Sequence, residues 1–231
     1  MITANCRDRL TAEDFDFVIE TLAKSDKESV SLVKLLTDNE TRDTILDHPR
    51  LFQSLLEGTA PLRISPQMYF YILTRHVLKE TGLEDRALTD YVASVLERFS
   101  DRARMRSPAT GATGPIQYVS DMLVALRQAS PTQTFLIRAH IGNYSLFITG
   151  IFHESIESRA QRGAPDLSFY EEMGRSSYRV AAGHQVARTA ALSEVLERLA
   201  DAFREVRGAL NRLSDTLLHL DSPSSPEIIT P

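Results

Sequence analysis

The sequence predicts an all-α protein: a multi-helix bundle around a buried central helix, with a long C-terminal amphipathic helix. Residues 135–152 are apolar on nearly every side when they are wound at 100° per residue, and such a helix is buried all round. Between Leu192 and Leu217, apolar residues recur at alternating spacings of four and three, which is a helical pattern. No stretch alternates polar and apolar residues as a half-buried β-strand would.

The composition is that of an ordinary soluble domain, with 42% hydrophobic and 25% charged residues in a chain of 231. A formal charge of −5 gives no general attraction to nucleic acid or anionic lipid. The single cysteine, Cys6, lies in an expected flexible terminus and excludes an intramolecular disulfide. Because residues 1–9 lack the apolar run of a signal peptide, we expect a cytoplasmic protein. The negative net charge leads us to expect no nucleic-acid or membrane partner.

Residues 1–106 are expected to form an N-terminal helical half. Its first helices are short and need tertiary packing to be stable. Capping residues or prolines mark their starts at Thr11, Asp26, Asn39 and Pro49. Two longer, more apolar helices are predicted to follow, one from Ser65-Pro66 to Thr81 and one from Asp85 to about Arg106.

A flexible loop is predicted at residues 107–115, because the segment is rich in glycine, proline and threonine. Residues 116–220 form the expected C-terminal helical half, which shares one core with the first half, and 221–231 are expected to be a disordered tail. The central helix opens at Ser130-Pro131, and a further helix begins at Asp166 or Ser168. That further helix carries a stripe of small residues and tyrosines that permits close helix packing: Tyr170, Gly174, Ser177, Tyr178 and Ala181.

The final helix is predicted to be continuous, with a seven-residue repeat of apolar side chains. Among its flanking positions only Arg207 is charged, so ionic selection of a partner is nearly absent. Packing within a bundle and a close-packed homodimer both fit this pattern. The residues predicted for self-association are Leu196, Leu199, Phe203, Val206, Leu210 and Leu213.

Polar residues inside the central helix are the main functional candidates, because a buried Arg or His needs a partner. One interpretation is an internal salt bridge from Arg138 to Glu171 or Glu172. The other is a polar pocket that holds a small ligand. The predicted pocket residues are Arg138, His140, Asn143, Tyr144, Tyr170 and Tyr178.

Common catalytic motifs are missing from the sequence. No Glu-x-x-His pair and no Gly-x-Ser-x-Gly elbow occurs, and no glycine-rich phosphate loop follows a strand. The stretch from His153 to Glu157 approaches the zincin pattern, but a glutamate stands where the second histidine is needed. We therefore predict no catalytic residue, no metal site and no cofactor.

Two segments carry a resemblance to known helical proteins. The stretch Ile141-Gly-Asn-x-x-Leu-Phe-x-x-Gly150, followed by Tyr170-x-x-Met-Gly-x-x-x-Tyr178, resembles an uncharacterised group of bacterial all-helical proteins, which implies a fold but no activity. The run from Ile141 to Ser145 is also similar to the glycine-rich distal helix of the haem-oxygenase-like fold. Because Asn143 replaces the aspartate and no histidine precedes His48, that resemblance implies the fold without the haem.

Two functions of different classes follow from these observations. The first is a non-catalytic bacterial helical module for protein–protein interaction or self-association, in a regulatory or scaffolding role. The second is a helical-bundle enzyme or small-molecule binder with its pocket beside the central helix. A closed polar cavity at that helix would favour the second function.

Overall fold

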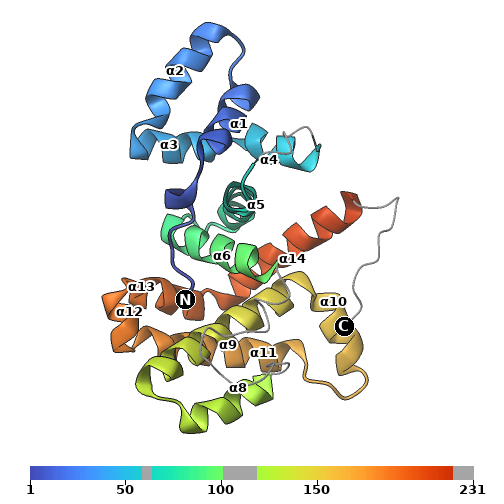
Figure 1. The fold of residues 1–231 in the computed structure, drawn as a ribbon. Helices are drawn as coiled ribbons and strands as arrows, with labels where there is room; N and C mark the ends of the chain where they lie inside the picture. The colour runs from blue at the N-terminus through green and yellow to red at the C-terminus, as the bar shows by residue number, and fades with distance from the viewer. Residues whose placement is uncertain (59–63, 101–118, 221–231) are drawn as a thin grey trace.

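The computed structural model describes residues 1–58, 64–100 and 119–220, and Figure 1 shows their arrangement. Within these ranges the chain forms thirteen α-helices and two short 3-10 turns, with no β-strand, which confirms the predicted all-α class. In the same ranges no helix has the length and apolarity to cross a membrane. The predicted loop at 107–115 and the predicted tail at 221–231 lie outside the described residues.

The first four helices form a small lobe at one end of the molecule, which we call the N-terminal lobe (Figure 1). Thr11 caps the first helix in a capping box with Asp14, and Ser25, Asp38 and His48 cap the next three. The predicted starts of these helices are therefore confirmed. Their bounds are α1 Ala12–Leu22, α2 Asp26–Leu36, α3 Asn39–Leu46 and α4 Pro49–Leu56.

Two longer helices, α5 (Pro66–Glu80) and α6 (Arg86–Phe99), connect the lobe to the rest of the molecule. On one side α5 packs Met68 and Tyr71 into the hydrophobic cluster of the lobe. On the other side, both helices contribute to the main core, which also contains residues of the last six helices. The main core is thus shared between the two predicted halves.

The central helix α9 (Pro131–Ile151) is buried along most of its length, as predicted. Ser130 and Gln133 form its capping box. Its glycines are close-packing positions: a Cβ atom on Gly142 would lie 2.5 Å from the ring of Tyr178, and one on Gly150 would lie 2.8 Å from the Cβ of Leu210. The neighbouring elements are α8 Val119–Ala125, the 3-10 turn η2 Leu126–Gln128 and α10 His153–Ala160.

The prediction of one continuous final helix is wrong, because the segment divides at Ala202 into two helices, α13 and α14. The division lets each part bury its apolar side against different neighbours: α13 packs on α6 and α11, whereas α14 packs on α9 and α5. The last four helices are α11 Leu167–Ala182, α12 Gln185–Thr189, α13 Ser193–Asp201 and α14 Phe203–Leu220.

The N-terminal segment is packed rather than flexible, which corrects the expectation for Cys6. Ile2 lies in the main core, and Cys6 is fully buried in the cluster of the lobe. The short turn η1 (Arg7–Arg9) follows, and Arg7 donates hydrogen bonds to Asp90 on α6. Burial raises the pKa of the Cys6 thiol to about 12, so the thiol stays protonated at neutral pH.

Candidate functional site

The central part of the predicted pocket is a hydrogen-bonded cluster inside the protein. The phenol of Tyr178 on α11 donates a hydrogen bond of 2.9 Å to Oδ1 of Asn143. The Tyr91 ring on α6 lies edge-on to that of Tyr178, with 6.5 Å between centroids. Burial raises the pKa of both phenols, so neither serves as a base at neutral pH. This cluster joins α6, α9 and α11.

The space beside this cluster is far too small for a metabolite. His140 and Asn143 line a cavity of about 30 Å³, together with Ile2, Tyr91 and Phe135. Such a volume holds about two water molecules, whereas small-molecule sites typically measure roughly 300–1,000 Å³. His140 also lies edge-on to Phe99, with 5.4 Å between ring centroids. His140 and Asn143 therefore contribute to the packing of the core rather than to a ligand site.

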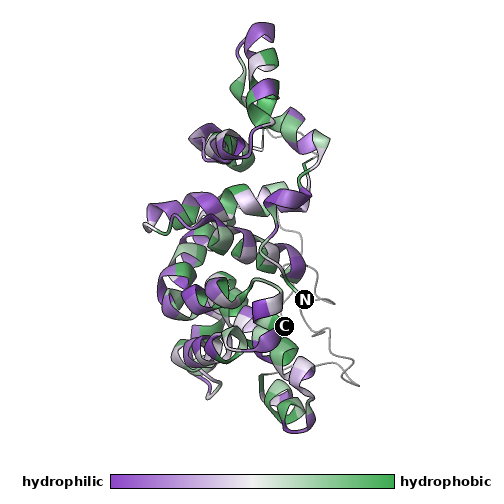
Figure 2. Ribbon diagram, turned by 90° about the vertical axis from the view of Figure 1, so that its left-hand side faces the viewer, coloured by the Kyte–Doolittle hydropathy of each residue, from purple (hydrophilic) through white to green (hydrophobic). Residues whose placement is uncertain are grey.

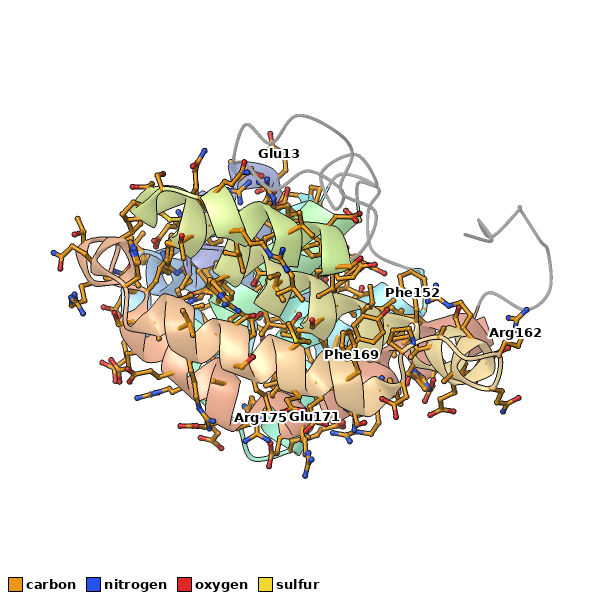
Figure 3. The ribbon with its side chains drawn as sticks, turned by 90° about the horizontal axis from the view of Figure 1, so that it is seen from below. Glu13, Phe152, Arg162, Phe169, Glu171 and Arg175 are labelled. Atoms are coloured by element: carbon orange, nitrogen blue, oxygen red, sulfur yellow. The ribbon has the colours of Figure 1, made fainter. Side chains whose placement is uncertain are left out.

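The other predicted pocket residues make different contacts. Tyr144 and Tyr170 are partly buried and pack against both the main core and the hydrophobic cluster beneath α8. Tyr144 follows Asn143 in α9 and is therefore turned by about 100° from it. Arg138 is half-buried and forms no ion pair among residues 1–58, 64–100 and 119–220. Glu171, one of its two expected partners, instead pairs with Arg204 and with Arg175, which lies near it on α11 in Figure 3. The structure thus joins Asn143 to Tyr178, whereas the six-residue pocket as a whole stays a prediction.

The residues predicted for self-association are buried in their own chain. All six have exposed fractions of 2% or less, and they pack against α5, α6, α9 and α11. Of the two arrangements that the seven-residue repeat allowed, the structure has the intramolecular bundle. The surface that we expected to form a dimer is therefore covered within the chain, because no side chain of the set is exposed to a second copy.

An exposed apolar surface does occur, but on α2 in the N-terminal lobe. Val30 and Val33 are 59% and 51% exposed, although a helix in a domain usually buries such residues. At 100° per residue they lie 60° apart, with Asp26 and Lys34 within 40° of Val30 on either side. We call these four residues the α2 strip. The helices at the top of the molecule in Figure 2, where the lobe stands, also carry hydrophobic residues.

A second surface feature is a groove of about 290 Å³ between α4 and α5. Leu46, Phe52 and Ile72 supply its apolar lining, and His76 stacks on Phe52 with 3.7 Å between ring centroids. Burial lowers the pKa of His76, although its neighbour Glu80 opposes this shift. The imidazole is therefore neutral at pH 7.

Asp47 also lines this groove and pairs with three cationic side chains. Its carboxylate accepts hydrogen bonds from Arg75, Lys79 and Arg86 at 2.8–3.2 Å. Burial opposes ionisation of Asp47, but these hydrogen bonds and charges outweigh it and lower the pKa to about 2. The network attaches the α3–α4 turn to α5 and α6.

Sequence reasoning missed both surface features. The helical spacing of Val30 and Val33 does not tell whether a partner helix is present. The groove residues come from three segments, so no local motif unites them. One signal was available for the groove: Arg75 and Lys79 lie four residues apart, and therefore on one side of a helix that is mainly apolar in its first half.

Comparison of the chain with protein-family models, with curated proteins and with solved structures finds no match. The two resemblances noted from the sequence therefore stay predictions.

Proposed function

We propose that this protein is a non-catalytic helical module for protein–protein interaction, and that it self-associates through the α2 strip. The observation that carries this proposal is the exposure of Val30 and Val33 on a helix at the end of the lobe, far from the main core. Contiguous exposed apolar side chains with polar neighbours are typical of protein-binding surfaces. The buried polar cluster at Asn143, by contrast, offers no space for a substrate.

A second copy of the chain is the occupant that the charges favour. In an antiparallel pairing of two α2 helices about a two-fold axis at Val30, residue 26 of each copy faces residue 34 of the other. Asp26 then lies opposite Lys34 twice, with the valines between the two pairs. A surface that complements itself under a two-fold rotation is what a symmetric dimer requires.

This dimer is expected to be weak, because the strip is narrow. Interfaces that bury less than about 1,200 Å² are typical of transient complexes. We therefore expect association that depends on concentration, and a dimer that weakens as salt screens the Asp26–Lys34 pairs.

Sedimentation equilibrium of the full chain between about 10 μM and 1 mM tests this proposal. The parent should dimerise with rising concentration, and the double variant Val30→Asp, Val33→Asp should stay monomeric with an unchanged circular dichroism spectrum. Val180→Asp is the matched control, because Val180 is 51% exposed on α11. A parent that is monomeric throughout, or a double variant that still dimerises, would overturn the proposal.

A charge exchange tests the proposed geometry separately. Asp26→Lys places like charges opposite each other and should weaken the dimer, and the added change Lys34→Asp should restore it. If the double exchange fails to restore a dimer that Asp26→Lys had weakened, the antiparallel pairing is wrong.

The groove between α4 and α5 favours a second candidate function, the binding of a small molecule. Its volume of about 290 Å³ approaches the lower limit of ligand sites, and it joins an aromatic surface to cationic groups. Native mass spectrometry of the purified chain should then show a bound compound that Phe52→Ala releases and the exposed-site control Phe169→Ala retains. A parent without such a mass, or equal retention by both variants, would exclude this candidate.

A further inference from the structure

The junction between α9 and α10 is held by side chains of α14. Phe152 leaves the helical conformation, with φ −119° and ψ 34°, so the last carbonyl groups of α9 need other partners. Asn211 donates to the carbonyl oxygens of Thr149 and Gly150, at 2.7 and 2.9 Å. Ser214 donates to that of Ile151 at 2.9 Å. These three hydrogen bonds therefore fix α14 against the end of α9.

Three metal-ligating side chains gather at this junction, and we call them the junction cluster: His153, Glu154 and Asp215. His153 and Glu154 begin α10, and Asp215 follows Ser214 on α14. Nε2 of His153 lies 3.7 Å from Oδ1 of Asp215. One ligand atom from each of the three residues lies within 4.8 Å of the other two. Nδ1 of His153 is shielded from solvent and has no hydrogen-bond partner among the described residues.

These separations suit a first-row divalent ion. Bond lengths of about 2.0–2.2 Å place the ligand atoms of a tetrahedral zinc ion roughly 3.4 Å apart. The 3.7 Å between His153 and Asp215 is close to that value, and contraction of about 1.4 Å at most would bring in Glu154. Imidazole and carboxylate are ligands that Zn²⁺ accepts, and two carboxylates supply charge that the cation neutralises.

We propose that the junction cluster binds one divalent transition-metal ion, with Zn²⁺ as the best match. His153 and Glu157 alone do not form this site. The third ligand comes from α14, about sixty residues away, which is why the sequence predicted no metal. Three protein ligands leave at least one position on the ion open to water. A bound ion would link α10 to α14 and so stabilise the junction.

Isothermal titration of the full, metal-free chain with Zn²⁺ tests the proposal. We expect saturable binding of one ion, and a loss of affinity of at least about tenfold in His153→Ala and in Asp215→Asn. Two control variants should bind as the parent does. His76→Ala removes another histidine that lies beside a carboxylate, and Glu157→Gln removes an exposed acid of α10 outside the cluster.

A thermal melt provides a second measurement that does not depend on the calorimeter. An ion that binds the folded chain raises the melting temperature of the parent and of both controls, but not of His153→Ala. Circular dichroism shows whether each variant is folded before titration. The proposal would be overturned if the parent showed no saturable binding. It would also be overturned if His153→Ala and Asp215→Asn bound Zn²⁺ as tightly as the parent. If His76→Ala lost as much affinity for Zn²⁺ as His153→Ala, the binding would be a non-specific property of histidines, and the proposal would be overturned as well.

Discussion

The N-terminal lobe and the main core use the same kind of helix but are held together differently. In the main core, apolar helices surround α9 so closely that Gly142, Gly150 and Gly174 are needed where side chains meet. In the lobe, the helices are short, and carboxylates add hydrogen bonds to a smaller hydrophobic cluster that includes Met68 and Tyr71 of α5. Asp14 accepts hydrogen bonds from the backbone and hydroxyl of Ser65, and Asp47 accepts them from three cations of α5 and α6.

The difference shows that a helical apolar pattern does not by itself mean burial. Val206 on α14 and Val30 on α2 both belong to such patterns. Val206 is fully buried because α14 packs against α9 and α5, whereas Val30 is 59% exposed because α2 contacts chiefly α1 and α3. Burial is thus decided by how many neighbours a helix has. The lobe therefore keeps apolar side chains on its surface.

The largest expected effect tests the close packing of the core. Gly142→Ala should lower the free energy of unfolding by about 3 kcal/mol, the upper end for overpacking. The reason is that the new Cβ would lie 2.5 Å from the fully buried ring of Tyr178. Urea denaturation followed by circular dichroism measures the change.

Gly208→Ala is the matched control for this substitution. The nearest neighbour of a Cβ there is the end of the Arg212 side chain at 4.0 Å, so the change should stabilise α14 by about 0.5–1 kcal/mol. If the two alanine variants proved equally stable, the close contact between α9 and α11 would not matter for folding.

The helix starts could be predicted from the sequence because their causes are local. Ser130 and Thr11 cap their helices with their own side chains, and Pro66 and Pro131 occupy first-turn positions that need no backbone N–H. The burial of α9 was also predictable, because a helix that is apolar all round has no other stable place. The division at Ala202 was not, since it depends on which helices lie beside each part.

The candidate sites depend on contacts between distant segments, so the sequence could not place them. Asn143 and Tyr178 were both among the predicted pocket residues, but only the structure shows the hydrogen bond between them. Tyr144 follows Asn143 directly in sequence, yet it also packs against the cluster beneath α8. Asp215 joins His153 only because α14 crosses the end of α9.

A smaller effect is expected from acid, and it tests the polar attachment of the lobe. The pKa of Asp47 is about 2 in the folded chain and about 4 when unfolded, so the stabilisation is complete above pH 4. As the pH falls from about 4 to 2, this carboxylate should lose about 2 kcal/mol of stabilisation. Urea denaturation of the parent and of Asp47→Asn at several pH values measures the difference.

Because other carboxylates titrate in the same range, the informative quantity is the parent minus the variant. That difference should be constant above pH 4 and should shrink below it, since the amide of the Asp47→Asn variant has no proton to bind. A difference that stays constant down to pH 2 would show that Asp47 is not stabilised by Arg75, Lys79 and Arg86. The lobe would then be attached mainly by its apolar contacts.

The smallest expected effect is the truncation of an exposed valine in the lobe. Val30→Ala should change the free energy of unfolding by less than about 0.5 kcal/mol, as is usual for surface substitutions. The same change at Val206 should cost about 1.5–3 kcal/mol, because that side chain is fully buried in the core. Both variants are measured by urea denaturation at a low protein concentration, at which a weak dimer dissociates. A cost at Val30 that matched the cost at Val206 would mean that α2 is covered within a single chain. Such a result would remove both the contrast between the two regions and the exposed surface on which self-association depends.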